Sequence, residues 1–226
     1  MGASEDDGSG DRILGVERGL LIRILELLRD KYPLADQANY FLERQGYAGI
    51  NITITNQRDA LSHLVTLLAD HDLDHDGQLA QLHNAEEHLR RAIAEPYERA
   101  LDMKFQDVLD LRERYIASAV PMLGHPALAG ALTLDRVDNK LKAAQFLRNN
   151  GRKAKARNKW DQEWENGIKC LLEAFECLED LERHIAEGVS KAEAERRGST
   201  SIRWGQIGVA IGIVGIIIGG LIAFLG

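Results

Sequence analysis

The stretch that decides the fold is residues 164–189, which read WENGIKCLLEAFECLEDLERHIAEGV. Apolar side chains recur in it at alternating spacings of four and three, the repeat of a helix that buries one face against other helices. This seam consists of Trp164, Ile168, Leu171, Phe175, Leu178, Ile185 and Val189, and Glu182 interrupts it. It predicts a long helix to about Glu195 in a coiled coil or an antiparallel bundle.

The segments just before this helix are also expected to be helical. One helix is predicted from about Pro96 to Val120, followed by a loop containing Gly124 and Gly130. A further helix of about 15 residues is expected to end at the turn signal 149–151 (Asn-Asn-Gly). Residues 96–197 are therefore expected to form a helical bundle.

Residues 12–95 are predicted to form a separate small helical module. The first helix has Leu21, Ile24, Leu25 and Leu28 on its apolar face and is expected to end near Tyr32-Pro33. A second ends at Gly46, because glycine adopts a left-handed conformation cheaply. Residues 50–55 alternate apolar and polar side chains, which is typical of a short strand. Two more helices are expected, one with Leu61, Leu64, Val65 and Leu68 and one that starts near Gln78 and ends or kinks at Pro96.

Composition excludes several classes of protein. The 226 residues carry 28 Lys and Arg against 35 Asp and Glu, a net charge of −7 that makes nucleic acid an unlikely partner. The two cysteines, Cys170 and Cys177, exclude a disulfide scaffold. No nucleophile–base pair, phosphate-binding loop or paired-carboxylate motif stands out, so we expect neither an enzyme nor a cofactor.

The last segment, residues 204–226, has no charged residue and is about 34 Å long as a helix, enough to span a membrane. Arg196, Arg197 and Arg203 precede it, and Trp204 suits the membrane interface. Because positive residues stay on the cytoplasmic side, we expect a tail-anchored, single-pass protein of the inner membrane with its bulk in the cytoplasm. Residues 198–203 are predicted to be a hinge, and residues 1–11 a disordered acidic tail.

Glycines form a stripe along the predicted membrane helix, at Gly205, Gly208, Gly212, Gly215 and Gly219. A stripe without side chains lets another helix approach closely, which favours self-association in the membrane. The alternative is glycine richness without pairing. Pore formation would require a lumen lined by glycine backbone.

Residues 72–77 resemble the opening of an EF-hand loop, with Asp72, Asp74 and Asp76 as candidate calcium ligands. His83 stands where the bidentate Glu of that loop belongs, so the competing interpretation is an acidic turn that caps the next helix.

A second candidate is the basic run Arg148, Arg152, Lys153, Lys155, Arg157 and Lys159. It is interpreted either as a patch for anionic lipid or an acidic partner, or as a solvated turn balanced by the net −8 of residues 160–195.

Residues 13–90 resemble the bacterial effector-associated domains, which are small, death-fold-like adaptors of conflict and immune systems. The resemblance rests on Tyr32-Pro33, Ala38, Phe41, Leu42, Gly46-Tyr47, Ala60, Leu64, Leu67-Leu68, Gly77, Leu79 and Leu82. It implies recruitment of an effector through binding between protein modules.

The sequence as a whole predicts a mainly α protein with an adaptor module, a bundle and a single membrane helix. Its expected function is membrane-anchored sensing through another protein, followed by oligomerisation that permeabilises the membrane. The alternatives are a tether or scaffold without pore activity and a phage lysis protein.

Overall fold

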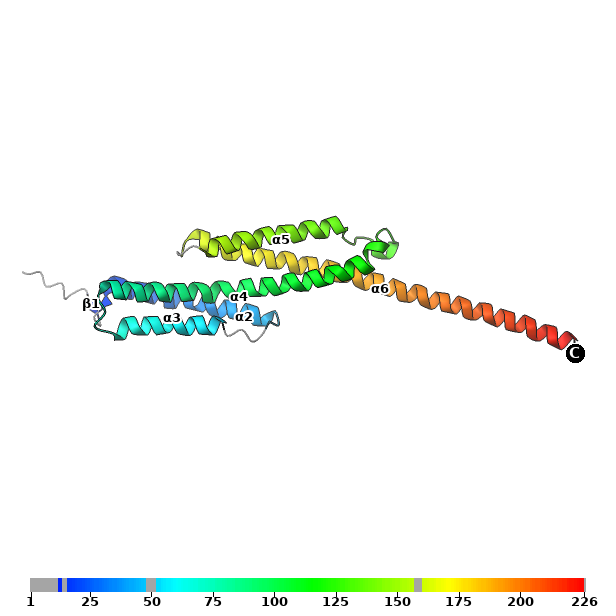
Figure 1. Ribbon diagram of the computed structural model, residues 1–226, viewed down its shortest axis with the longest axis horizontal. Coiled ribbons are helices and arrows are strands. Elements are labelled where there is room, and N and C mark those ends of the chain that lie inside the picture. Colours follow the sequence, from blue (N-terminus) through cyan, green and yellow to red (C-terminus); the bar gives the residue numbers. More distant parts are fainter. Residues whose placement is uncertain (1–11, 14–15, 48–51, 157–159, 226) are drawn as a thin grey trace, which may run out of the picture. The chain divides into compact units, whose positions relative to one another are not determined.

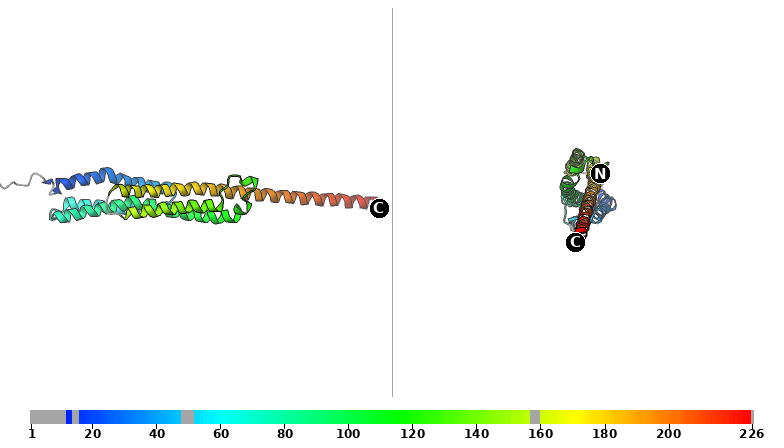
Figure 2. Two further views of the ribbon diagram at one scale, coloured as in Figure 1. Left: turned by 90° about the horizontal axis from the view of Figure 1, so that it is seen from above. Right: turned by 90° about the vertical axis from the view of Figure 1, so that its right-hand side faces the viewer.

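The computed structural model describes the backbone of residues 12–13, 16–47, 52–156 and 160–225. Side chains are described for residues 16–47, 53–153, 155–156 and 160–198. The chain is mainly helical, as predicted (Figures 1 and 2). The elements in chain order are β1 (Arg12–Ile13), β2 (Val16–Glu17), α1 (Arg18–Glu26), the π-helical η2 (Leu27–Lys31), α2 (Tyr32–Arg44), α3 (Ile52–Ala69), α4 (His75–Ser118), the 3-10 turns η3 (Val120–Met122) and η4 (Pro126–Leu128), α5 (Leu134–Lys155) and α6 (Gln162–Leu225).

The contacts divide the chain into two units that share helices α4, α5 and α6. Unit 1 comprises residues 1–104 and 143–176, and unit 2 comprises residues 105–142 and 177–226. Helix α4 passes without interruption through Pro96, so the helix end that the sequence offered as one possibility there is wrong. The predicted domain boundary at 95/96 thus falls inside one helix.

Unit 1 has a core in which α1, α3 and α4 meet. Strands β1 and β2 form a two-residue antiparallel pair that precedes α1. The buried residues of this core are Val16, Leu20, Ile24, Leu27, Ala60, Leu64, Leu67, Leu82, Ala85 and Leu89. A smaller cluster joins α2, α4 and the start of α6 through Ala35, Ala92, Ile93 and Trp164. Trp160 packs against both clusters.

The predicted strand at 50–55 is wrong for the residues that the structure describes, because α3 already begins at Ile52. Six residues of strand pattern cannot be stable without a partner strand. As a helix the same segment buries Thr53 and Gln57 in line with Ala60 and Leu64. In this helical conformation Ile54 is exposed.

The first helix does not end near Tyr32-Pro33. Helix α1 continues through η2 into α2, and Pro33 lies in the first turn of α2, directly after the π-helical η2. Of the predicted apolar face, Ile24 is buried, whereas Leu25 is 65% exposed. The end of α2 is confirmed, because Gly46 follows it with a φ of +78°.

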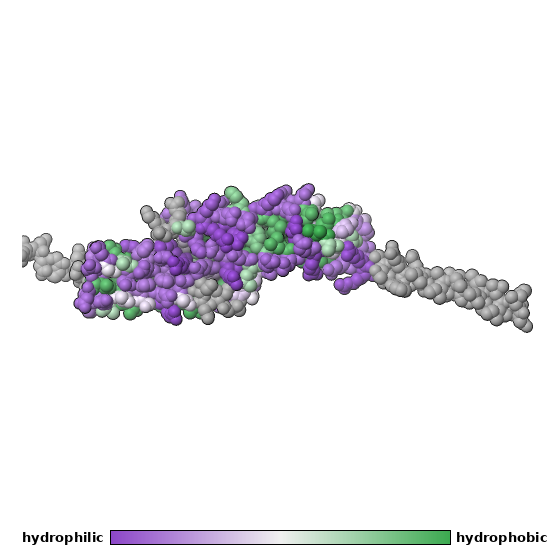
Figure 3. All heavy atoms as spheres, viewed as in Figure 1, coloured by the Kyte–Doolittle hydropathy of each residue, from purple (hydrophilic) through white to green (hydrophobic). Residues whose placement is uncertain are grey.

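Unit 2 is built from the second half of α4, the first part of α5 and the continuation of α6. Its buried side chains include Val108 and Tyr115 of α4, Val137 of α5, and Leu178 and Ile185 of α6. On the face drawn in Figure 3, hydrophobic surface gathers over the α4 and α5 segments of this unit. The predicted loop is confirmed, and Gly124 and Gly130 both have positive φ.

The seam of the long helix is confirmed as a buried face. Trp164, Leu171, Phe175, Leu178, Ile185 and Val189 are all buried, and Ile168 is partly buried. The turn predicted at 149–151 is wrong, because α5 continues to Lys155. Gly151 is used for close helix packing instead, since a Cβ there would lie 2.9 Å from the carbonyl oxygen of Gly167 in α6.

Candidate binding site around Trp160

Trp160 lies in the link between α5 and α6, immediately before the capping residue of α6. The backbone N–H of Trp164 donates to Oδ1 of Asp161 at 2.9 Å, which is the hydrogen bond of an N-terminal cap. The rings of Trp160 and Trp164 meet at 65°, with centroids 4.8 Å apart. The cap and this ring contact fix the start of α6. The indole of Trp160 then packs over residues of η2 and α4.

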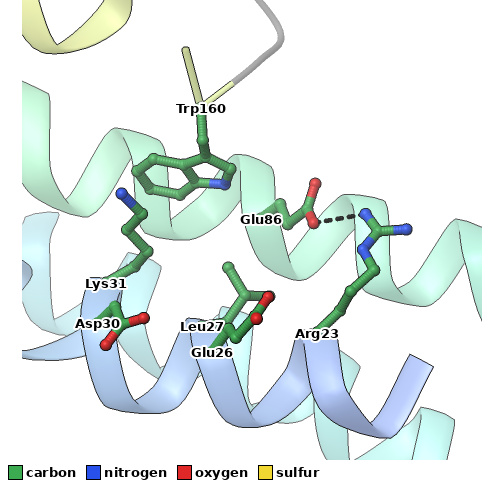
Figure 4. A pocket seen from close by; sticks show the side chains of 7 residues that line it. All are labelled: Arg23, Glu26, Leu27, Asp30, Lys31, Glu86 and Trp160. Carbon is green, nitrogen blue, oxygen red and sulfur yellow. Dashed lines mark hydrogen bonds and ion pairs between the residues drawn. The ribbon is translucent and has the colours of Figure 1, made fainter. Parts of the chain in front are cut away.

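A cavity of about 190 Å³ lies beside this indole (Figure 4). Its walls come from α1, η2, α4 and the α5–α6 link. The lining residues are Arg23, Glu26, Leu27, Asp30, Lys31, Glu86 and Trp160. The cavity therefore combines apolar surface with charged groups of both signs.

Two cationic side chains lie close to the indole ring of Trp160. Lys31 Nζ lies 5.0 Å from the ring centroid of Trp160, and Arg90 Cζ lies 5.6 Å from it. Both distances are within the range of cation–π attraction. Arg90 is only 5% exposed, and burial lowers the pKa of its guanidinium. An arginine nevertheless stays charged in a protein, so the structure holds a buried positive charge beneath Trp160.

The carboxylate of Glu86 is the nearest acidic group to that charge. Its Oε1 accepts a 2.7 Å hydrogen bond from Arg23 Nη2, which joins α1 to α4. Its Oε2 is 4.0 Å from Arg90 Nη1, which is too long for a hydrogen bond. Among the described residues, neither Nη atom of Arg90 has a hydrogen-bond partner.

A second cavity of about 220 Å³ shares Lys31 with the first. Its other lining residues are Leu34, Ile93, Tyr97, Trp164, Glu165, Ile168 and Lys169. Burial raises the pKa of the Tyr97 hydroxyl. Lys31 Nζ and Glu165 Oε1 are 4.0 Å apart at the edge of this mainly apolar space.

The acidic turn before α4 acts as a helix cap. Oδ1 of Asp74 accepts a 2.8 Å hydrogen bond from the N–H of Gly77, and Oδ1 of Asp70 accepts one from the N–H of Asp72. Asp76 lies in the first turn of α4, where a negative charge is favourable. Within the described residues, no group of three or more His, Cys, Asp or Glu side chains is placed to hold a metal ion.

The basic run has its partners on α4, not in the acidic block 160–195. Arg148 and Arg152 bind Asp102, the latter at 2.9 Å, and Lys155 binds Glu98 at 2.6 Å. Lys153 is exposed, and Arg157 and Lys159 lie outside the described residues. The segment through Lys155 is helix, so the predicted solvated turn is wrong there. Three of the six basic side chains are thus already neutralised.

The remaining predicted residues lie in or near α6. Cys170 and Cys177 are half-buried free thiols, and burial raises the pKa of Cys177. Arg196 Nη2 donates to the carbonyl oxygens of Ala117 and Ser118 and so caps the end of α4. Arg197 pairs loosely with Glu193, at 3.7 Å.

The predicted hinge at 198–203 is wrong, because α6 continues as one helix to Leu225. The segment contains no proline, the residue least favourable in the interior of a helix. Arg203, Trp204 and the glycine stripe (Gly205, Gly208, Gly212, Gly215 and Gly219) belong to residues 199–226, whose side chains are outside the described part. Among the helical segments whose side chains the structure describes, which end at residue 198, none is long and apolar enough to cross a membrane.

Sequence reasoning did not find the site around Trp160. The signal that was present is an aromatic pair, Trp160 and Trp164, directly after the basic run. The sequence does not show that Arg90, 70 residues earlier, lies under Trp160, nor that Arg23 reaches Glu86. Comparison of the chain with protein-family models, curated proteins and solved structures finds no match.

Proposed function

We propose that this chain is a membrane-anchored interaction protein of a bacterial conflict or immune system. In this proposal, residues 12–95 receive a signal from another protein. Helix α6 then links that module and the bundle to an apolar segment, residues 204–226, which self-associates through its glycine stripe. The bulk of the chain lies on the cytoplasmic side of the inner membrane.

The observation that carries the proposal is the continuity of α6. One helix includes the buried seam from Trp164 to Val189 and then extends to Leu225, through a segment without a charged side chain after Arg203. Three arginines before the uncharged segment and none within it favour insertion with those arginines in the cytoplasm. A continuous helix also gives a direct mechanical connection between the bundle and the segment.

Exposed apolar side chains on α1 and α3 support the protein-binding part of the proposal. Ile22 and Leu25 of α1 are 49% and 65% exposed, and Ile54 and Val65 of α3 are 58% and 61% exposed. Exposed large apolar side chains are available for contact with another protein. The resemblance of residues 13–90 to effector-associated domains agrees with binding to another protein module.

Cross-linking of the full chain in bacterial membranes tests self-association. Gly212→Ile combined with Gly215→Ile should abolish the cross-linked oligomers, because the new side chains hold the helices apart. The matched control is Ile211→Leu combined with Ile218→Leu, which keeps the glycines and should leave the oligomers unchanged. Unchanged oligomers in the glycine double variant would contradict the role of the stripe.

The response of the membrane distinguishes an effector from a tether. The full chain is expressed from an inducible promoter, and membrane potential is followed with a voltage-sensitive dye. Loss of potential on forced oligomerisation, but not in the glycine double variant, is the result expected of an effector. A potential that stays intact under every forced oligomerisation would assign the chain to the tether class.

A further inference from the structure

The carboxylate of Glu86 lies between two arginines in the site around Trp160, and its distances to them are unequal. Glu86 Oε1 is 2.7 Å from Nη2 of Arg23, whose side chain is 48% exposed. Glu86 Oε2 is 4.0 Å from Nη1 of Arg90, whose side chain is 6% exposed. The arginine that water already solvates therefore receives the short hydrogen bond.

This distribution is unfavourable for Arg90. A buried charge without hydrogen-bond partners costs far more than an exposed one, because water no longer solvates it. Because Arg23 holds Oε1 of the same carboxylate, its hydrogen bond opposes a movement of Glu86 towards Arg90. A second anion that bound Arg23 would permit that movement, so its binding would gain from the improved pairing of Arg90.

The cavity beside Trp160 is placed to hold such an anion. Arg23 and Lys31 both line it, and its volume of about 190 Å³ is several times the share of one water molecule, about 30 Å³. Among the described residues, the ammonium group of Lys31 lies 4.0 Å from Glu165 and 5.0 Å from the centre of the Trp160 ring. Leu27 and the indole of Trp160 supply apolar surface for the body of a ligand (Figure 4).

Acidic residues at the cavity limit what can enter it. Glu26, Asp30 and Glu86 also line the space, and Asp30 is paired with Arg29 at 2.7 Å. They repel a polyanion such as nucleic acid and admit a ligand with one acidic group. We propose that the cavity binds a small molecule through a single carboxylate or phosphate group, which contacts Arg23 and Lys31 while Glu86 shifts to Arg90. This site does not depend on membrane anchoring.

Isothermal calorimetry on the full chain in detergent tests the proposal. Sodium phosphate and sodium acetate are titrated separately at constant ionic strength, and saturable binding of at least one of them is expected. Binding of phosphate alone identifies a phosphate group as the ligand feature, and binding of acetate alone identifies a carboxylate. Absence of saturable binding for both anions overturns the proposal.

Variants locate the anion and test the shift of Glu86. Arg23→Gln should weaken binding by about tenfold or more, because it removes a charge-assisted hydrogen bond. Arg23→Lys, which keeps the charge, should bind the anion with an affinity between those of the original chain and Arg23→Gln. The control, Arg58→Gln, changes an exposed arginine of α3 that pairs with Asp59. Neither residue lines the cavity, so the affinity should stay unchanged. Equal effects of Arg23→Gln and Arg58→Gln overturn the assignment.

Arg90→Met provides the sharper test, because Arg90 does not line the cavity. If Glu86 moves to Arg90 on binding, the variant weakens anion binding while its circular dichroism and thermal midpoint show an intact fold. Unchanged affinity in folded Arg90→Met would overturn the coupled movement of Glu86.

Discussion

A Cβ atom at Gly188 of α6 would lie 2.4 Å from Cε2 of Tyr115 in α4. Tyr115 is fully buried, and its hydroxyl donates a hydrogen bond to the carbonyl oxygen of Leu132, so the ring is held at both ends. The glycine is therefore what lets the two helices of unit 2 approach around this ring.

Gly188→Ala is expected to destabilise the protein by about 1–2 kcal/mol. Overpacking a filled core costs about 1–3 kcal/mol, and the better helix propensity of alanine offsets up to about 1 kcal/mol of it. Gly198→Ala is the matched control, because no atom of the described residues outside its own turn of helix lies within 4 Å of its Cβ position. It should stabilise the helix by up to about 1 kcal/mol. Denaturant unfolding measures both, and equal effects of the two changes would refute the packing role of Gly188.

Gly151→Ala should destabilise unit 1 in the same way. Its Cβ would lie 2.6 Å from Cδ2 of Leu171 and 2.9 Å from the carbonyl oxygen of Gly167. Because a backbone atom cannot move aside as a side chain can, we expect a loss of about 2–3 kcal/mol. An unchanged unfolding midpoint in Gly151→Ala would contradict the close packing of α5 against α6 at this residue.

Asp74→Ala should cost about 1 kcal/mol, the usual effect of removing an N-terminal cap. Asp76→Ala should cost less, about 0.3–1 kcal/mol, because it removes only a charge in the first turn. Asp72→Ala should change stability little. Thermal unfolding with and without calcium separates this order from a calcium site, for which all three substitutions would abolish a calcium-dependent rise in midpoint.

The pH dependence of stability should report the contact between Asp180 and Lys140. Hydrogen bonds from Lys140 and then Arg183 lower the pKa of Asp180 to about 2. The unfolded value is about 3.9, so the folded state favours the ionised form and gains stability from it above that pH. The gain is lost as the pH falls from about 4 towards 2.

Asp180→Asn tests this prediction. The variant should be less stable than the original chain at pH 7 and at pH 5, and the difference should shrink as the solution is acidified through the window from 4 to 2. Urea unfolding at each pH gives the two free energies. A difference that stays constant through this window would show that Asp180 does not titrate as described.

Part of the fold follows from local pattern alone. The spacing of Trp164, Leu171 and Leu178 predicts a buried helical face, and the structure confirms it because any packed helix must bury such a stripe. Gly46 predicts the end of a helix for an equally local reason, its access to positive φ. Local pattern misled at 50–55, where tertiary contacts along Thr53, Gln57 and Ala60 favour helix over strand.

The candidate site was less predictable than the fold. Arg23, Glu86, Arg90 and Trp160 come from three separate segments, and only Glu86 and Arg90, four residues apart on one helix, are related by their spacing. The capping role of Asp74 could be predicted from the sequence, because its partner Gly77 is three residues away. The partners of Arg152 and Lys155 were not, because they lie 50 or more residues away on another helix.

The sequence by itself determined that the chain is mainly helical, which face of the long helix is buried, and where an uncharged segment follows three arginines. These properties depend on periodicity and on runs of residues, which act within one helix. Only the tertiary structure decided that Asp102 and Glu98 neutralise the basic run, that Gly151 and Gly188 permit close packing, and that Glu86 stands between Arg23 and Arg90. Pairing of charges and fit of side chains depend on which helices become neighbours, and that outcome is set by the free energy of the whole packed core.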